Sequence, residues 1–413
     1  MKNLKSCLLS KGVQMPVPES VELGPDIDPE RISGDNVTIH AGCRIFGQHT
    51  FIGAGAEIGL EAPATIDNCQ VGPNVQLKGG FFSQAVFLGG AACGSCAHVR
   101  SGTILEEAAS IAHSVGLKQT ILFPYVTLGS LINFCDCLMA GGTGKKNHSE
   151  VGSAYIHFNF TPQQDKATAS LIGEVPGGVM LDKPPIFLGG QGGLVGPCRL
   201  TYGITIAAGT IYRKDELRPD RLIFGGSEKS GNISYKSGAY RNVKRIFLNN
   251  LIYIGNLLAL GKWYQTVRSQ FISDAFPQPL YDGLTARLDQ AVSERIKRLH
   301  SFFEKLAGAP ENDTSIPARQ KQALYERRTE ITEALEKKLD LEGSDGSDAN
   351  AARDQLLEAV RSGISASGTD YLSVIKNLSA DDRASGTRWL QASVDAVVAE
   401  ALDIVPEFKT EKG

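Results

Sequence analysis

The sequence predicts a mainly β fold, a parallel β-helix over residues 32–213, followed by an all-α region, and two observations support this. An apolar residue followed by glycine recurs with a period of six at Phe46-Gly47, Ile52-Gly53 and Ile58-Gly59. This period matches neither an α-helix nor an alternating strand, and it is typical of the hexapeptide repeat of β-helices. From Ala239 onward, helix-forming and charged residues dominate and glycine becomes rare.

Each hexad is expected to be one short strand and one turn, with the apolar residue pointing inward. The pair recurs with looser spacing where glycine follows Val71, Leu88, Val115, Leu128, Val151, Ile172 and Leu188. Three hexads close a triangular turn of about 18 residues, so this region holds about ten turns. The looser spacing indicates loops that leave the coil at its corners. Strands of a β-sandwich would recur every ~8–12 residues instead.

Three segments follow from these patterns. Residues 1–31 form a lead-in segment, residues 32–238 the β-helix domain, and residues 239–413 an α-helical domain with a polar linker near 342–350. The apolar periodicity predicts helices over residues 240–271, 282–306, 317–341, 351–363 and 381–404. The helical domain shows no catalytic motif, so we expect it to pack, oligomerise or bind a protein partner.

Composition excludes several classes of partner. The net charge of −3 offers no basic excess for nucleic acid or an anionic membrane. The most apolar window, residues 246–260, is shorter than the ~20 residues of a membrane span, and asparagines interrupt it. Near the N-terminus, the apolar stretch is too short for a signal peptide. We therefore expect a cytoplasmic protein whose eight cysteines are reduced.

The cysteine pairs Cys93/Cys96 and Cys135/Cys137 are the nearest approach to a zinc motif. They lie about 40 residues apart, which is more than two turns and ~10 Å along the coil. We expect these cysteines to fill the core, and we expect no metal site.

Two histidines are the candidate catalytic bases, because acyl transfer to an amine needs a base near neutrality. His148 follows the glycine- and lysine-rich segment 141–146, and His157 alternates with Phe158 on a strand. Either histidine can act as the base, or both can be ordinary surface or groove residues.

Two glycine-rich segments are candidates for binding phosphate and a thioester. Segment 141–146 places backbone N–H groups beside Lys145 and Lys146, which suits a phosphate, although a surface loop explains it equally. Gly189, Gly190, Gln191, Gly192 and Gly193 leave a backbone bare enough for a thioester or pantetheine to approach. Lys183, in a proline-stiffened loop, is a further candidate for phosphate.

Residues 148–214 resemble the acetyltransferase domain of the bifunctional UDP-N-acetylglucosamine pyrophosphorylase/glucosamine-1-phosphate N-acetyltransferase. The resemblance rests on two segments: residues 148–173, with Ile156-His157-Phe158-Asn159-Phe160 and Lys166, and residues 188–210, with Ile206-Ala207-Ala208-Gly209-Thr210. It implies a left-handed β-helix, a homotrimer and acetyl-CoA as co-substrate in a cleft between subunits. It also implies that Asn159 and Phe160 contact the sugar, that Lys166 contacts its phosphate, and that Gly190 and Ala208 meet acetyl-CoA.

The sequence departs from that family in two ways that limit which activities we expect. The family's catalytic histidine falls on Gly142 in this register, and the tyrosine that follows it is missing. Only about 31 residues precede the coil, fewer than a nucleotide-binding α/β unit needs, so we do not expect uridylyl transfer from this chain.

The sequence thus predicts an acetyl-CoA-dependent transferase that acts on an amino sugar phosphate or nucleotide sugar. The alternative is a non-catalytic trimeric scaffold or sensor that binds a sugar nucleotide, with the helical domain as its docking arm.

Overall fold

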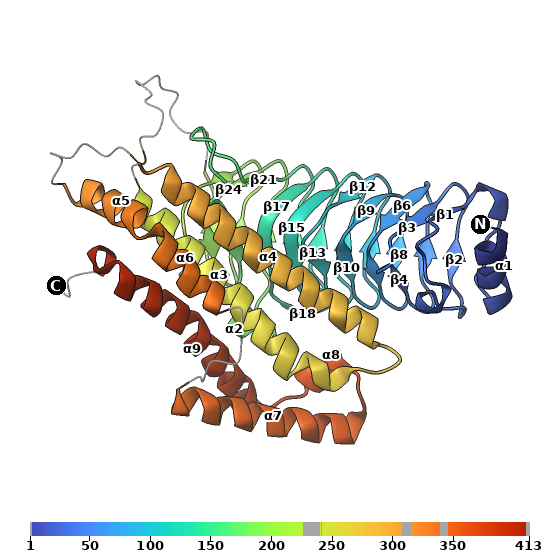
Figure 1. Cartoon of the computed structure of the whole chain (residues 1–413). Coiled ribbons are helices and arrows are strands. Elements are labelled where there is room, and N and C mark those ends of the chain that lie inside the picture. Colours follow the sequence, from blue (N-terminus) through green and yellow to red (C-terminus); the bar gives the residue numbers. More distant parts are fainter. Residues whose placement is uncertain (1, 226–239, 241, 308–314, 339–345, 410–413) are drawn as a thin grey trace.

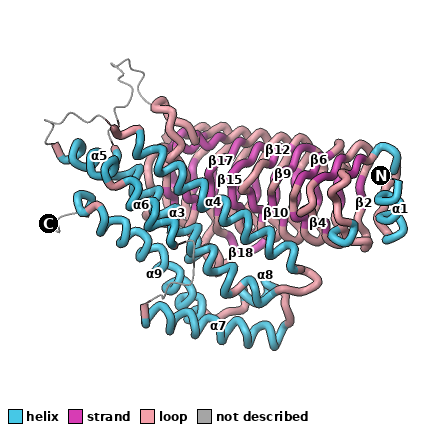
Figure 2. The backbone as a smooth tube through the Cα atoms, in the orientation of Figure 1, coloured by secondary structure: helices cyan, strands magenta, loops and turns pink. Residues whose placement is uncertain are grey.

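The computed structural model describes residues 2–225, 240, 242–307, 315–338 and 346–409. Strands between residues 22 and 223 stack into a parallel β-solenoid, and long helices lie along one side of it (Figure 1). The tube view shows the helices, in cyan, lying along the stacked strands, in magenta (Figure 2). The predicted parallel β-helix and the predicted all-α region are both confirmed. Among the helices of the described residues, none is long and apolar enough to cross a bilayer.

The solenoid is triangular, and we number its faces in chain order. Face 1 contains β1 (Glu22–Leu23), β3 (Arg44–Phe46), β6 (Ala64–Asp67), β9 (Gly80–Ser83), β12 (Ala97–Val99), β21 (Ile156–Phe158), β24 (Gly193–Val195) and β27 (Ile211–Tyr212). Face 2 contains β4 (Phe51–Ile52), β7 (Gln70–Val71), β10 (Ala85–Phe87), β13 (Thr103–Leu105), β22 (Ser170–Ile172) and β25 (Arg199–Leu200). The longer strands β15 (Gly116–Leu122) and β17 (Asn133–Met139) run through both faces.

Face 3 is a single ten-stranded parallel sheet. It contains β2 (Thr38–Ile39), β5 (Glu57–Ile58), β8 (Gln76–Leu77), β11 (Ala92–Cys93), β14 (Ser110–Ile111), β16 (Thr127–Leu128), β20 (Glu150–Val151), β23 (Phe187–Leu188), β26 (Thr205–Ile206) and β28 (Leu222–Ile223). The second residue of each pair points inward, so that Leu77, Cys93 and Ile111 stack on one another in register. The residues of this column are the apolar residues that recur in the hexapeptide repeat of the sequence.

The coil begins earlier than the lead-in segment 1–31 suggested. Strand β1 already pairs with β3, and Leu23-Gly24 is a copy of the repeat signature that lies inside that segment. Ahead of it, helix α1 (Lys2–Lys11) lies across the N-terminal end of the coil, with short 3₁₀ turns η1 (Pro18–Ser20) and η2 (Pro29–Arg31) (Figure 1).

Most of the cysteines fill the core, as the sequence predicted for Cys93, Cys135 and Cys137, whereas Cys96 is exposed, contrary to the prediction. Cys69, Cys93, Cys137 and Cys198 are fully buried, and burial raises the pKa of the Cys69 thiol to about 12. All eight cysteines are free thiols. No group of three metal-ligating side chains occurs within the described ranges.

Face 2 is apolar on its outer side as well as its inner side. The outward residues Val86, Ile104, Ile121, Leu138 and Leu171 are all buried. Parallel strands that are buried on both faces have consecutive apolar residues in the sequence. The pairs Ile104-Leu105 and Leu138-Met139 are examples in this chain. Helix α4 covers β7, β10 and β13, and α3 covers β22, so the helical region and the solenoid share one core.

The helical layer follows the predicted pattern with three changes. It contains α3 (Val243–Thr266), η3 (Arg268–Phe271), α4 (Gln278–Glu304), α5 (Ile316–Glu326), α6 (Arg328–Lys337), α7 (Ser347–Ser367), α8 (Tyr371–Lys376), α9 (Ala380–Ile404) and η4 (Pro406–Phe408). The helix expected over 317–341 is split at Arg327, and α8 was not predicted. The end of the predicted linker, residues 347–350, is the first turn of α7, whereas residues 339–345 and the 238/239 boundary lie outside the described residues.

Buried ion pairs fasten the helices to the coil. The Arg268 guanidinium lies over the Tyr371 ring and donates to Glu107 at 2.5 Å, and Tyr264 donates to Glu106 at 2.5 Å. Burial, reinforced by the Glu107 charge, raises the pKa of Glu106. At a different corner of the coil, where β17 passes from face 1 to face 2, Arg295 of α4 pairs with Asp136 at 2.6 Å. Both side chains are buried. The helical region is therefore anchored to the solenoid at more than one corner.

Candidate functional site

Three corners join the faces, and the longest insertions in the repeat lie in the C-terminal half of the coil. The 2–3 corner carries residues 140–149 and 173–186, and the 1–2 corner carries residues 159–169. The 3–1 corner carries residues 152–155 and 189–192. In one chain the predicted site residues are therefore divided: His148, Lys145, Lys146 and Lys183 at the 2–3 corner, Asn159, Phe160 and Lys166 at the 1–2 corner, and Gly189–Gly193 with Ala208 at the 3–1 corner.

The segment predicted as a phosphate loop is a β-hairpin. Strands β18 (Gly142–Gly144) and β19 (Asn147–His148) pair antiparallel, with Lys145 and Lys146 at the exposed tip. Gly142 has φ +98°, and a Cβ there would lie 2.6 Å from the Cα of His148. Its N–H donates to Lys183 O at 3.0 Å and is not free for a phosphate. The geometry of the hairpin thus explains why residue 142 is a glycine. The side chains that the hairpin exposes at its tip are those of Lys145 and Lys146.

Ser149 fixes the base of the hairpin. Its hydroxyl donates to Ala140 O at 2.8 Å and accepts the N–H of Ile186 at 2.8 Å. Together with the bond from Gly142 to Lys183, this ties the two insertions of the 2–3 corner to each other. Lys183 therefore lies beside the hairpin that carries His148.

His148 has a defined tautomer. Its Nδ1 lies 2.9 Å from Lys145 O, and because a carbonyl only accepts, Nδ1 must carry the proton. In the neutral ring Nε2 is then the basic nitrogen. It lies 3.8 Å from Glu150 Oε2, and the ring is about one-quarter exposed. This geometry can accept a proton from an acceptor amine or hydroxyl.

A fourth lysine joins the 2–3 corner from the helical region. Lys376 of α8 donates to the Tyr125 hydroxyl at 3.0 Å, and its Nζ would lie 3.3 Å from a Cβ on Gly144. Asp182 supplies the local acid, at 3.2 Å from Lys183 and 3.6 Å from Arg383. No signal in the sequence points to Lys376, because only packing of α8 brings it to the hairpin.

His157 lies in the core of the coil, which neither of the two sequence readings expected. It points into the coil between Phe134 and Leu194 and is 2% exposed. Its Nδ1 donates to Cys135 O at 2.6 Å, and its Nε2 accepts from the Ser170 hydroxyl at 2.8 Å. Burial lowers its pKa to about 4. Both nitrogens are occupied inside the solenoid, so His157 is placed as a core residue and not as an accessible base.

The pH dependence of stability tests this placement of His157. An exposed histidine has a pKa near 6.5, so between about pH 6.5 and 4 the unfolded chain binds a proton that the folded chain does not. The free energy of unfolding should therefore fall by up to about 3 kcal/mol as the pH falls through this window. In His157→Leu this component should be absent. Urea unfolding at pH 7 and pH 5 measures it, and an equal fall in both proteins would refute the buried neutral ring.

Asn159 is part of the contact between α4 and the solenoid. Its Nδ2 donates to Asp136 Oδ2 at 2.8 Å, and the other oxygen of Asp136 is held by Arg295. Phe160 is exposed and Lys166 is half-buried in the same insertion. The amide of Asn159 therefore has a structural bond at the place where the resemblance implies a sugar contact.

The glycines of the 3–1 corner are required by contact between successive coils. A Cβ on Gly189 would lie 2.3 Å from Ala208 N, and one on Gly190 would lie 2.7 Å from Ser153 O. The close approach of successive coils therefore accounts for these glycines without a ligand. Gln191 is exposed at this corner, as is Ala208 one coil further on.

One polar ladder at the 3–1 corner was not among the predicted site residues. His113 Nδ1 lies 2.8 Å from the Ser130 hydroxyl, and Ser130 N donates to the Ser153 hydroxyl at 3.1 Å. The three residues come from successive coils and are 17 and 23 positions apart in the sequence. No local sequence pattern therefore shows that they are neighbours.

Comparison with known proteins agrees with the resemblance. The bifunctional protein GlmU of Pelobacter propionicus is 28% identical over 209 residues, which is 50% of this chain and 40% of that protein. The GlmU proteins of Oleidesulfovibrio alaskensis (25% over 230 residues, 55% and 45%) and Thermotoga petrophila (27% over 197 residues, 48% and 37%) match similarly. The chain thus spans less than half the length of these relatives.

Two further comparisons are less informative. No family model matches the chain. Among solved structures, the polysialic acid O-acetyltransferase OatWY matches at 15% identity and a TM-score of 0.18, over 56% of this chain and 90% of that one, which supports neither activity nor substrate. About half of this chain is therefore similar to GlmU and carries the hexapeptide-repeat β-solenoid that the resemblance implied.

Proposed function

We propose that this protein is an acyl-CoA-dependent acyltransferase whose base is His148. The observation that supports this most directly is the fixed tautomer of His148, with a basic Nε2 at a lysine-rich corner. In the proposed reaction the acceptor nitrogen or oxygen attacks the thioester carbonyl as His148 takes its proton. The C–S bond then breaks, and the CoA thiolate leaves and receives that proton. The similarity to GlmU supports the same class of reaction.

The acceptor we propose is an amino sugar phosphate or nucleotide sugar. Lys145 and Lys146 at the hairpin tip, with Lys183 and Lys376 beside the hairpin, offer ammonium groups to phosphate oxygens. Asp182, Glu150 and Glu174 are acidic side chains near them, fewer than the four lysines, so the corner has an excess of positive charge. A phosphorylated acceptor would be held here with its reacting group toward His148.

The acyl donor is proposed to be acetyl-CoA, bound at the 3–1 corner of a neighbouring copy in a homotrimer. In one chain the 2–3 and 3–1 corners lie at opposite edges of face 3, so a single chain does not place the two corners side by side. Face 2 is covered by α3 and α4, which leaves faces 1 and 3 for association. Large exposed apolar residues gather there: Leu60, Leu131, Phe81, Ile156, Phe158, Ile211, Phe187 and Leu222. Packing of such copies would bring the two corners together.

The trimer proposal predicts that Leu131→Glu combined with Ile156→Glu yields monomers without acyl transfer. Leu131 is 60% exposed and Ile156 is 42% exposed, so the charges should not disturb the fold of one chain. The matched control is Ile316→Glu in α5, which is 69% exposed and distant from these faces. Sedimentation gives the oligomeric state and thiol release gives the activity. Monomers with full activity would contradict a site shared between copies.

The function itself is tested with acetyl-CoA and a panel of amino sugar phosphates and nucleotide sugars, with free thiol as the readout. Thiol release that depends on an acceptor supports the proposal. No release from any acceptor, together with no CoA binding by calorimetry, refutes it. Sugar-nucleotide binding without turnover would instead support the scaffold alternative, in which the helices are a fixed layer on face 2 and not a free arm.

We also propose that the protein acts in the cytoplasm. Its cysteines are all free, and several fill the core of the coil, where a disulfide partner is not provided. Reduced thiols are the ordinary state of cysteine in that compartment.

A further inference from the structure

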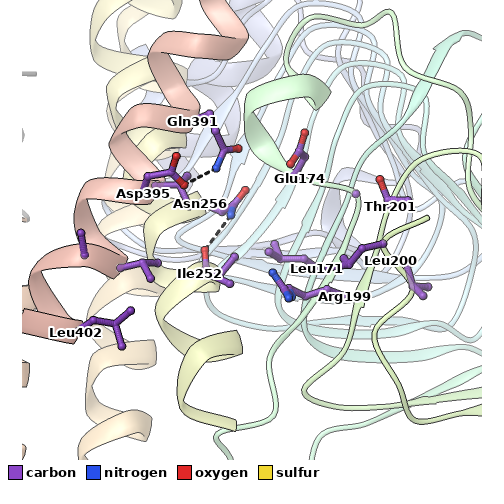
Figure 3. A pocket seen from close by; sticks show the side chains of 15 residues that line it. Leu171, Glu174, Arg199, Leu200, Thr201, Ile252, Asn256, Gln391, Asp395 and Leu402 are labelled. Carbon is purple, nitrogen blue, oxygen red and sulfur yellow. Dashed lines mark hydrogen bonds between the residues drawn. The ribbon is translucent and has the colours of Figure 1, made fainter. Parts of the chain in front are cut away.

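A cavity lies between the last coils of the solenoid and the helical layer, and Gly173 and Glu174 of the 2–3 corner contribute to its wall. Its volume is about 450 Å³, which is in the range of small-molecule sites, and it lies at an interface between two layers where such sites are common. Its walls come from β22 and β25 of face 2, from α3 and from α9 (Figure 3). The helical region has therefore created a pocket that the solenoid alone does not have.

One edge of the cavity is acidic. Glu174, Gln391 and Asp395 lie along it in Figure 3, and Gln391 donates to Asp395 at 2.8 Å. Burial raises the pKa of Glu174, and the Asp395 charge raises it further, against the opposing effect of Lys183. Two carboxylates held near each other at the edge of a cavity favour a cationic group between them.

The opposite side presents an arginine with unused donors. Arg199 lines the cavity, and its Nε is buried without a hydrogen-bond partner within the described residues. Its nearest acid, Asp215, is 3.8 Å away and already accepts from Asn249 at 3.1 Å and from the Arg199 backbone N–H at 3.0 Å. The guanidinium can therefore accommodate an acidic group of a ligand.

The rest of the lining is aliphatic and rigidly framed. Its apolar side chains are Leu171, Leu200, Leu217, Ile252, Val394, Val398 and Leu402. Asn256 accepts from Val175 N at 2.8 Å and donates to Ile252 O at 2.8 Å, and Thr387 of α9 donates to Pro176 O at 3.2 Å. These bonds hold the loop that carries Glu174 against both helices, so the cavity is formed before any ligand binds.

We propose that this cavity binds a small zwitterion of the amino-acid type with an aliphatic body. Its ammonium group lies at the edge formed by Glu174 and Asp395, its acidic group meets Arg199, and its aliphatic part contacts the leucine and valine walls. None of the side chains proposed to bind this zwitterion takes part in the proposed acyl transfer, so the proposal does not depend on that function, although the insertion that carries Glu174 also carries Lys183.

Three probes that differ by one charge test the assignment on the full chain: L-leucine, 3-methylbutylamine and 4-methylpentanoate. Calorimetry and ligand-observed NMR should show leucine binding, with each single-charge probe at least about tenfold weaker. No leucine binding at about 10 mM would refute the site. Equal or tighter binding of the amine or the acid would refute the zwitterion.

Two variants that each remove one charge then test the two charged ends of the ligand separately. Asp395→Asn should weaken leucine and the amine about tenfold and leave the acid unchanged, whereas Arg199→Gln should weaken leucine and the acid and leave the amine unchanged. Leu217→Trp at the exposed rim should weaken leucine, while Ile316→Trp, equally exposed on α5, should not. The reverse pattern of the charge variants, or equal effects on all probes, would place binding elsewhere.

Discussion

Replacing His148 by glutamine is expected to lower the rate of acyl transfer by about 10²–10⁴-fold, the usual contribution of a positioned base. Glutamine keeps the size and polarity of the side chain but cannot take a proton near neutrality. Because His148 is partly exposed and its Nδ1 bond is local to the hairpin, the fold should be unaffected. Binding of acetyl-CoA should also be unchanged, since the base acts on the acceptor.

The matched control for this prediction is His300→Gln. His300 is a partly exposed histidine on α4, 3.8 Å from Glu304, and it has a carboxylate neighbour as His148 does. Initial rates of thiol release for both variants, with circular dichroism as a check of folding, make the comparison. Full activity of His148→Gln would remove His148 as the base and direct attention to His113 at the 3–1 corner.

Replacing Arg295 by methionine is expected to lower the free energy of unfolding by about 3–5 kcal/mol, because it leaves the buried carboxylate of Asp136 without its counter-charge. Both side chains of this pair are nearly inaccessible, at 3% and 6%, so water cannot replace the guanidinium. Asn159 remains as a neutral donor to the carboxylate and offsets only part of the loss. The pair also joins α4 to the coil, so the loss should affect the whole helical layer.

Two controls separate the buried charge from the loss of an arginine. Arg298→Met removes a partly exposed ion pair with Glu294 on the same helix and should cost no more than about 1 kcal/mol. Adding Asp136→Asn to Arg295→Met removes the orphaned charge and should recover a large part of the stability. Urea unfolding of the three variants measures this. Similar losses for Arg295→Met and Arg298→Met would show that the buried pair has no special role.

Some features of the site were readable in the sequence and others were not. The breaks in the repeat predict the insertions at 140–149 and 173–186. The polarity of the lysines at the hairpin tip predicts that they are exposed. The inward direction of His157 was not readable, because strand alternation leaves either His157 or Phe158 inside. Only the register of β21 against β24, which aligns His157 with Leu194, decides between them.

The sequence by itself determined the coil, because each hexad is a local unit in which one apolar residue points inward and one glycine turns the chain. It also determined the positions of the long helices from their apolar periodicity. The tertiary structure alone decided that α3 and α4 cover face 2, that Lys376 reaches the hairpin, and that a cavity forms between Arg199 and Asp395. Those contacts join residues far apart in the sequence, 251 positions for Lys376 and Tyr125 and 83 positions for Asn250 of α3 and Ala167, and no local pattern records which distant surfaces pack together.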